Sequence, residues 1–267
     1  MHTPHRLAAV LLVSSTLAAP TTTLAQVQLG TSVGTLVDDL VSANRILYDQ
    51  NVVDGFGHIS ARSPVDPAHF FMARSVAPSA VTATDILEFD ADGKVVTADT
   101  RATYAERFIH SEIYRTRPEV MAIVHAHAAS VIAFGIANVP LRPVYHMSAF
   151  LGHGTPIFEI RDAAGKNVET DMLVKNAALG ARLAERLGKA NVVLMRGHGF
   201  TVVGSSVPVV TFRAVYTDQN ARIQAEALRL GTPRYLSDQE AALAQETMER
   251  LSVRSWEMWK KQIRLTP

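Results

Sequence analysis

Apolar residues recur at helical spacing in several stretches of this chain. From 36 to 48 they lie three or four residues apart, which predicts an amphipathic helix that ends at the polar residues 49–51. The same spacing, with Gly, Pro and capping residues at the ends, predicts helices at 103–115, 129–136, 172–187, 208–230 and 238–263. Two of these begin with the Ser/Thr-x-x-Glu pattern of a capping box, Thr103 with Glu106 and Ser237 with Glu240.

Shorter stretches have the alternation or the β-branched composition of strands, and turn residues separate them. They lie at 58–62, 70–74, 86–89, 94–96, 120–127, 143–147, 155–158, 192–195 and 200–203. The Asp92-Gly93 pair before 94–96 is a hairpin signal. Because helices alternate with strands that are often joined by hairpin-type turns, the pattern predicts an α/β fold. We expect a three-layer α/β/α arrangement around a largely antiparallel or mixed central sheet.

The first residues depart from this pattern. An Arg and two His precede an apolar or small run at 7–19, and residues 23–25 offer a cleavage site before Gln26, as in secretory signal peptides. An uncleaved anchor or an ordinary first helix is the alternative, although the run is shorter than the roughly 20 residues that span a bilayer. We expect a signal peptide at 1–25 and a periplasmic or secreted protein, or a cytoplasmic one if the leader is not functional.

The remainder has the composition of an ordinary globular protein. A chain of 267 residues that is 48% hydrophobic, without an internal linker or repeat, predicts a single domain at 26–267. The 26 basic and 25 acidic residues become 25 and 25 once the Arg of the leader is removed, so we expect no nucleic-acid partner. No later stretch is apolar and long enough for a transmembrane helix, so we expect no membrane partner. Because the chain has no Cys, any metal must be held by His, carboxylate or water.

Three histidines are candidate metal ligands. His125 and His127 stand at the end of a predicted strand, where alternate side chains project from one face roughly 7 Å apart. Such a pair is also compatible with one buried structural His and one exposed His. His198 ends another predicted strand between two glycines, which permit close backbone approach. Three imidazoles with one open position are typical of a catalytic zinc-like site.

Glu106 has two interpretations. As the fourth residue of the Thr103 motif it can cap the helix through its own carboxylate. Its side chain can equally point toward the metal, and the spacing alone does not separate these alternatives.

Together these residues resemble the class II aldolase/adducin family. The resemblance extends from about 36 to 230 and rests on Glu106, His125-x-His127, the downstream Gly-His198-Gly, Arg117-Pro118 and the Gly-His-Ile-Ser turn. It implies that the three His bind a divalent ion, Zn first and Mn, Fe or Co otherwise, with Glu106 as the acid/base. It also implies a homotetramer with active sites between subunits.

The chain departs from the sugar-phosphate aldolases of that family. Their phosphate is held by small polar residues, and the corresponding positions here are His58, Ser75-Val76 and Tyr104-Ala105. A Val in place of Gly blocks backbone approach to an anion, and the Tyr-Ala pair removes two small hydroxyl donors. The chain is instead similar to a branch that decarboxylates hydroxylated aromatic or pyridine dicarboxylates, so His58, Ser75 and Tyr104 become candidate substrate-binding residues.

Two further residues complete the predicted site. The planar guanidinium of Arg74 suits a substrate carboxylate, although a surface salt bridge explains it equally well. His146 lies roughly where the aldolases carry a Tyr proton donor, so either His146 or Glu106 would deliver the proton that replaces CO₂. A packed structural His is the alternative for His146.

The resulting hypothesis is a metal-dependent carbon–carbon lyase for a small carboxylated substrate. It would decarboxylate a hydroxylated aromatic or heteroaromatic acid, with the metal stabilising the enolate that forms. The alternatives are an aldolase for an unphosphorylated sugar-like or hydroxy-acid substrate, an iron-dependent oxygenase, and a non-catalytic binding module like the adducin head.

Overall fold

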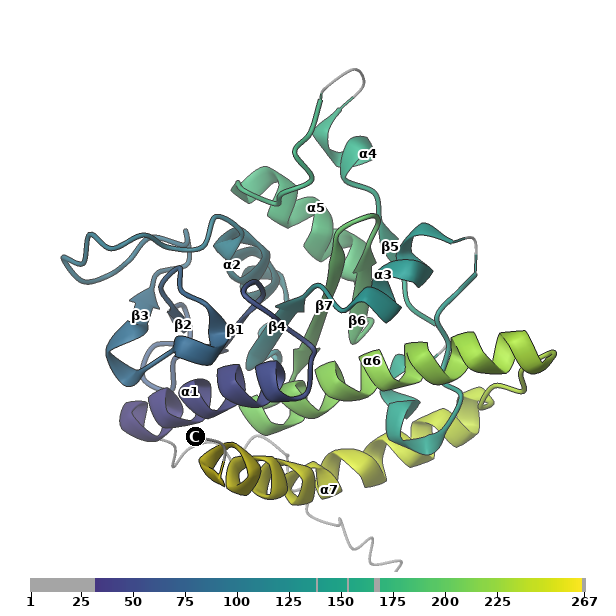
Figure 1. The fold of residues 1–267 in the computed structure, drawn as a ribbon. Helices are drawn as coiled ribbons and strands as arrows, with labels where there is room; N and C mark the ends of the chain where they lie inside the picture. Colours follow the sequence, from purple (N-terminus) through teal and green to yellow (C-terminus); the bar gives the residue numbers. More distant parts are fainter. Residues whose placement is uncertain (1–31, 138, 153, 166–168, 266–267) are drawn as a thin grey trace, which may run out of the picture. The chain divides into compact units, whose positions relative to one another are not determined.

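A single seven-stranded sheet forms the centre of the computed structural model, which describes residues 32–265 apart from 138, 153 and 166–168. The strand order is β3-β2-β1-β4-β7-β6-β5 (Figure 1). Neighbouring strands are antiparallel, except that β5 and β6 are parallel. The strands are β1 His58–Arg62, β2 Phe70–Ala73, β3 Ile86–Phe89, β4 Ala122–Ala126, β5 Ile157–Phe158, β6 Val192–Met195 and β7 Gly199–Gly204. The predicted mixed, largely antiparallel sheet is confirmed.

Helices cover both faces of this sheet, with α1 and α6 on one side and α2 and α5 on the other (Figure 1). Strand side chains alternate in direction, so Ile123 of β4 packs with α2 and α5, whereas Val124 packs with α1 and α6. The three predicted layers are therefore present. The helices are α1 Val33–Asp49, α2 Arg107–Thr116, α3 Ala129–Ile136, α4 Ile160–Ala164, α5 Ala177–Leu187, α6 Val207–Leu230 and α7 Asp238–Leu265, with short 3-10 turns at η2 Pro78–Ala80, η3 Ala83–Asp85 and η4 His146–Leu151.

The predicted strand at 143–147 is wrong. Side chains of α6 take the hydrogen bonds that a neighbouring strand would supply: Asn220 Nδ2 donates to the Arg142 carbonyl (2.8 Å), and Val144 N–H donates to Asn220 Oδ1 (3.0 Å). The segment runs extended along α6 and then enters η4. The strand expected at 94–96 is reduced to one bridge between Phe89 and Val95 after the turn at Gly93.

The N-terminal leader at 1–25 lies outside the described residues. Among the helices that are described, none combines the length and the apolar character needed to cross a membrane. The second predicted capping box is confirmed, because Ser237 N–H donates to Glu240 Oε2 (2.8 Å) and Glu240 N–H donates to Ser237 Oγ (3.3 Å) at the start of α7.

Gly180 brings α5 into close contact with α2. A Cβ at this position would lie 2.4 Å from the Phe108 carbonyl oxygen and 2.9 Å from Glu112 Cγ. We expect Gly180→Ala to lower the free energy of unfolding by about 1–3 kcal/mol, because the two helices must separate. Gly34→Ala in α1 is the control, since the atom nearest its Cβ would be 3.7 Å away. Urea unfolding of both variants tests this, and equal stabilities would contradict it.

Candidate metal centre

His125 and His127 come together at the end of β4. His125 is a fully buried residue of β4 and lies opposite His58 of the neighbouring strand β1. His127 follows the last residue of β4. Their Nε2 atoms are 2.9 Å apart. The expected convergence of the two imidazoles is therefore present, and neither ring is the exposed member of the pair that the structural alternative requires.

His198 reaches the same point from the turn between β6 and β7. Gly197 has φ +64°, in the left-handed region that favours glycine. A Cβ on Gly199 would lie 2.2 Å from the Ala126 carbonyl oxygen and 2.9 Å from the His127 ring. These two glycines let the turn approach β4 closely enough to place His198 Nε2 3.1 Å from His127 Nε2.

Glu106 completes the group, and its predicted capping box is wrong. The residue is itself the N-cap of α2 and makes no side-chain capping bond there. Its Oε2 lies 3.4 Å from His125 Nε2 and 3.3 Å from His198 Nε2. Its Oε1 accepts a hydrogen bond from Val174 N–H (2.9 Å). The carboxylate thus faces the imidazoles instead of the helix end.

Backbone carbonyls orient two of the imidazoles. His125 Nδ1 lies 3.1 Å from the Phe200 carbonyl oxygen, and His198 Nδ1 lies 2.8 Å from the Met172 carbonyl oxygen. A carbonyl only accepts, so each Nδ1 carries the proton and each Nε2 presents a lone pair to the centre of the group.

The segment that supplies this orientation corrects the predicted helix at 172–187. The helix begins only at Ala177, after the N-cap Asn176. Met172 has φ +69°, its carbonyl accepts from His198, and the nearby Val174 N–H donates to Glu106. A positive φ at Met172 is incompatible with a right-handed helix, and its carbonyl already accepts from His198, so the helix cannot begin there.

Electrostatics favour a cation at this point. Burial and the neighbouring His125 and His198 lower the pKa of His127 to about 3. Burial raises the pKa of Glu106, but His125 and His198 outweigh it, so the pKa falls below its ordinary value. Although burial opposes the shift, Glu106 in turn raises the pKa of His198. The site therefore combines imidazole nitrogens with a carboxylate.

The donor set fits a divalent ion. All four ligand atoms, one from each of Glu106, His125, His127 and His198, lie within 4.8 Å of one another. Ligands of a tetrahedral ion at about 2.1 Å are themselves roughly 3.4 Å apart, close to the separations found here. Lone pairs so near one another repel unless a proton or metal ion lies between them.

The candidate substrate residues lie at different depths. His58 is buried beside the group, with its ring centroid 5.1 Å from that of His125 and 4.6 Å from that of Tyr104. The Tyr104 hydroxyl donates to the Val76 carbonyl. Ser75 is exposed. Tyr104 thus lies beside His58, and its hydroxyl connects the segment before α2 to the residues that follow β2 through this hydrogen bond.

Arg74 forms the ion pair that was the alternative to substrate binding. Its Nε donates to Asp85 Oδ1 (2.7 Å), and the Asp85 side chain is buried. Neither Nη nitrogen has a hydrogen-bond partner within the described ranges, so the end of the guanidinium remains available to a ligand.

His146 is not brought to the metal-ligand group of its own chain. It is exposed at the start of η4, with its ring beside Tyr145. The sequence also gave no role to His110, which is fully buried and hydrogen bonded to His58. Its position four residues after Glu106, on one face of the same helix, was the signal that could have identified it.

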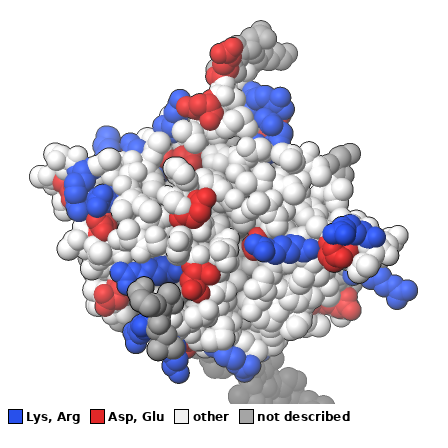
Figure 2. All heavy atoms as spheres, viewed as in Figure 1, with Lys and Arg blue, Asp and Glu red and all other residues white. Residues whose placement is uncertain are grey.

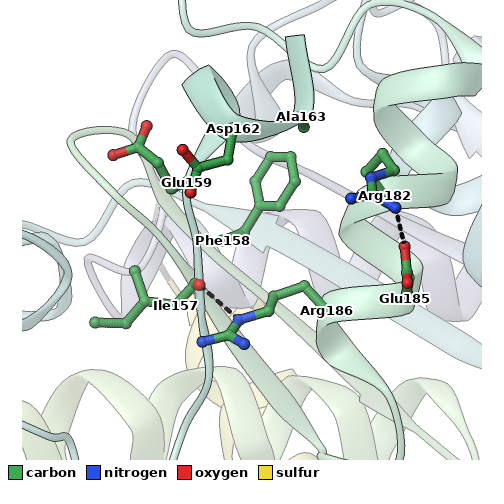
Figure 3. Close-up of a pocket in the computed structure, with 8 residues that line it drawn as sticks. All are labelled: Ile157, Phe158, Glu159, Asp162, Ala163, Arg182, Glu185 and Arg186. Carbon is green, nitrogen blue, oxygen red and sulfur yellow. Dashed lines mark hydrogen bonds and ion pairs between the residues drawn. The ribbon is translucent and has the colours of Figure 1, made fainter. Parts of the chain in front are cut away.

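A cavity of about 470 Å³ lies apart from the ligand group, between β5, α4 and α5. Its charged side chains are largely paired: Arg182 binds Glu185, and Arg186 donates to the Ile157 carbonyl (Figure 3). On the face in Figure 2, acidic and basic side chains are interspersed. That face has no broad basic patch of the kind that binds nucleic acids.

Comparison with known proteins identifies the family. Residues 38–225 match the model described as Class II Aldolase and Adducin N-terminal domain. The chain belongs to the class II aldolase/adducin family. The predicted resemblance is confirmed, and the complete Glu and His group lies within the matched part of this family member.

Decarboxylases are among the relatives of this class II aldolase/adducin protein. It is 38% identical to Decarboxylase tropJ of Talaromyces stipitatus over 248 residues, 85% of this chain and 93% of that protein. It is 31% identical to 3,4-dihydroxyphthalate decarboxylase of Terrabacter sp. over 202 residues, 72% of this chain and 81% of that protein. A crystal structure of an aldolase II superfamily protein from Pseudomonas syringae matches with TM-score 0.71 and 22% identity, covering 88% and 94% of the two chains.

Proposed function

We propose that this protein is a metal-dependent decarboxylase of a hydroxylated aromatic or heteroaromatic carboxylate. One observation carries the proposal: the three imidazoles and the carboxylate are complete and convergent in a chain whose relatives include decarboxylases matched over 85% and 72% of its length. A non-catalytic module like the adducin head would not require this donor set. A divalent ion held by His125, His127 and His198 would supply a Lewis acid that polarises a substrate oxygen.

The remaining residues have separate tasks. Arg74 binds a substrate carboxylate through its Nη nitrogens, while Asp85 holds its Nε. Glu106 faces the imidazoles through Oε2, so it serves as a ligand of the ion or as the acid/base. Either Glu106 or His146 delivers the proton that replaces CO₂.

We further propose that the protein acts as a homotetramer, exported through its leader, with active sites between subunits. Exposed apolar side chains along α7 support an interface there, among them Leu243 (64% exposed), Val253 (55%) and Met258 (54%). In such an assembly the exposed His146 would be able to act in a neighbouring copy's site. Light scattering of the purified protein measures the number of copies, and a monomer would contradict this proposal.

The test of function is a substrate screen on the purified chain. The protein is treated with chelator, reloaded with Zn, Mn, Co or Fe²⁺, and incubated with hydroxylated aromatic mono- and dicarboxylates, including 3,4-dihydroxyphthalate. We expect CO₂ release that depends on the metal. Release of an aldehyde from a hydroxy acid without CO₂ would favour the aldolase, and failure to bind any metal would favour the binding module.

A further inference from the structure

A chain of four buried side chains extends from the metal-ligand group into the interior. His58 Nδ1 lies 2.7 Å from His110 Nε2, His110 Nδ1 lies 2.6 Å from Ser60 Oγ, and Ser60 Oγ lies 2.8 Å from the Tyr114 hydroxyl. None of the four side chains is more than 6% exposed. We call this set the histidine chain, and none of its hydrogen bonds involves a metal ligand.

The secondary structure explains why these residues line up. His58 and Ser60 are alternate residues of β1, so their side chains leave the same face of the sheet. His110 and Tyr114 are four residues apart on α2, as are Glu106 and His110. One face of α2 therefore carries both the carboxylate of the metal centre and the inner half of the histidine chain.

The hydrogen bonds of the histidine chain can run in two directions, depending on which group donates in each bond. In one direction Tyr114 donates to Ser60, Ser60 donates to His110 Nδ1, and His110 Nε2–H donates to His58 Nδ1. Each of these three donors then has an acceptor within the histidine chain. His58 carries its own proton on Nε2. In the opposite direction Ser60 donates to Tyr114, and the buried Tyr114 O–H has no acceptor among the described residues. An unsatisfied buried hydroxyl is costly, so the first direction is favoured.

Both hydrogen-bond directions require the His110 imidazole to be neutral. His110 is fully buried, and burial together with the nearby His125 lowers its pKa to about 3. A neutral imidazole has one N–H, so it must accept at one nitrogen and donate at the other. Because Ser60 donates to His110 Nδ1, His110 must donate from Nε2 to His58 Nδ1.

The free end of the histidine chain is His58 Nε2, which is not completely enclosed. His58 Nε2 has no hydrogen-bond partner within the described part of the chain, and it is not one of the fully buried polar atoms that lack a partner. The His58 ring lies between Tyr104 and His125, so this nitrogen is beside the metal centre. A protonated Nε2 has no lone pair, which explains how a fourth His can stand here without competing for the ion.

We propose that Tyr114, Ser60 and His110 hold His58 as the neutral tautomer protonated on Nε2, and that this N–H binds a negatively charged oxygen of the substrate beside the metal. His58 is then a substrate-contacting donor, and the other three are positioning residues. The substrate contact rests on the proposed decarboxylase function, whereas the tautomer follows from the hydrogen bonds and from the burial of His110.

The tautomer is measured directly by NMR on the zinc-loaded full chain with ¹⁵N-labelled histidine. His58→Phe identifies the His58 signals by their disappearance. We expect a protonated Nε2 and an unprotonated Nδ1 on His58, with the same pattern on His110. A proton on His58 Nδ1, or on both nitrogens, would overturn the proposal without reference to any substrate.

Two buried hydroxyls provide matched variants for kinetics. Ser60 links the histidine chain, whereas Ser111 Oγ is buried without a hydrogen-bond partner. We expect Ser60→Ala to lower kcat/KM roughly 10-fold and to mix the two His58 tautomers, and Ser111→Ala to change neither. Tyr114→Phe, which keeps the ring, should also mix the tautomers. Equal effects of the two Ser variants, with an unchanged His58 signal, would contradict the positioning role.

The substrate contact has its own variant pair. His58→Phe removes the donor, and His58→Gln restores an N–H at a similar distance from the backbone, so we expect Gln to recover part of the activity that Phe loses. Equal activity in the two variants would overturn the contact. If His58 has the expected tautomer but no hydroxylated aromatic acid is decarboxylated, the proposed function and the contact fail, while the direction of the histidine chain stands.

Discussion

Glu106→Gln is expected to lower kcat by about 10²- to 10⁴-fold, the range associated with loss of an acid/base group. The two carboxylate oxygens have different partners. Oε1 accepts a hydrogen bond from Val174 N–H, and Oε2 lies beside the Nε2 atoms of His125 and His198. An amide has one acceptor oxygen, so Gln can replace only one of these two oxygens. Since all three imidazoles remain, we expect the variant to contain metal when it is purified with an excess of the ion.

Glu112→Gln is the matched control for this experiment. Glu112 is buried on the same helix, but its carboxylate pairs with Arg115 and lies outside the ligand group. We expect near-normal turnover in this variant. Steady-state kinetics and metal analysis on both proteins separate the outcomes, and full activity in Glu106→Gln would remove Glu106 from the mechanism.

His127→Ala is expected to weaken metal binding by more than about 100-fold, because loss of a second-shell partner alone typically costs 10- to 100-fold. His127 Nε2 lies 2.9 Å from His125 Nε2 and 3.1 Å from His198 Nε2, so its removal leaves only two imidazoles in the set. Affinity is measured by competition with a chromophoric chelator, together with the metal content of the purified protein.

His69→Ala is the control for metal binding. His69 is a partly exposed residue whose ring contacts Glu88, and it is not a member of the metal-ligand group. We expect its metal content to equal that of the unchanged protein. If His127→Ala keeps one tightly bound ion, the ion is held elsewhere and the assigned centre is wrong.

Periodic elements were predictable because each is encoded by neighbouring residues. The helix at 129–136 was predicted with its observed ends, and β4 was predicted within about two residues at its first end. In the structure β4 and β7 are neighbours, and Ile123 and Val203 face one core while Val124 and Val202 face the other. Such elements depend on local period and on burial, and both are visible along the chain.

Two of the incorrect predictions have a similar cause. Residues 143–147 resemble a strand, but Asn220 on α6 satisfies their backbone groups instead of a neighbouring strand. Residues 172–176 resemble a helix start, but Met172 has φ +69° and its carbonyl accepts from His198. In each case a residue distant in the sequence takes a backbone hydrogen bond that the local pattern assigns to secondary structure.

The family, the layered fold and the four residues of the candidate centre were all predictable from the sequence. The sequence left open whether Glu106 caps a helix or faces a metal, and it did not indicate the role of His110. The packing of distant segments answers both questions: the Glu106 carboxylate faces the imidazoles, and His110 is hydrogen bonded to His58. His127 and His198 are 71 residues apart, and His58 and His110 are 52 apart, so their meeting depends on how β1, β4, α2 and the turn before β7 pack together. Hydrogen-bond direction and ligand convergence are properties of that packing, because they require atoms from distant segments to lie within about 3 Å of one another.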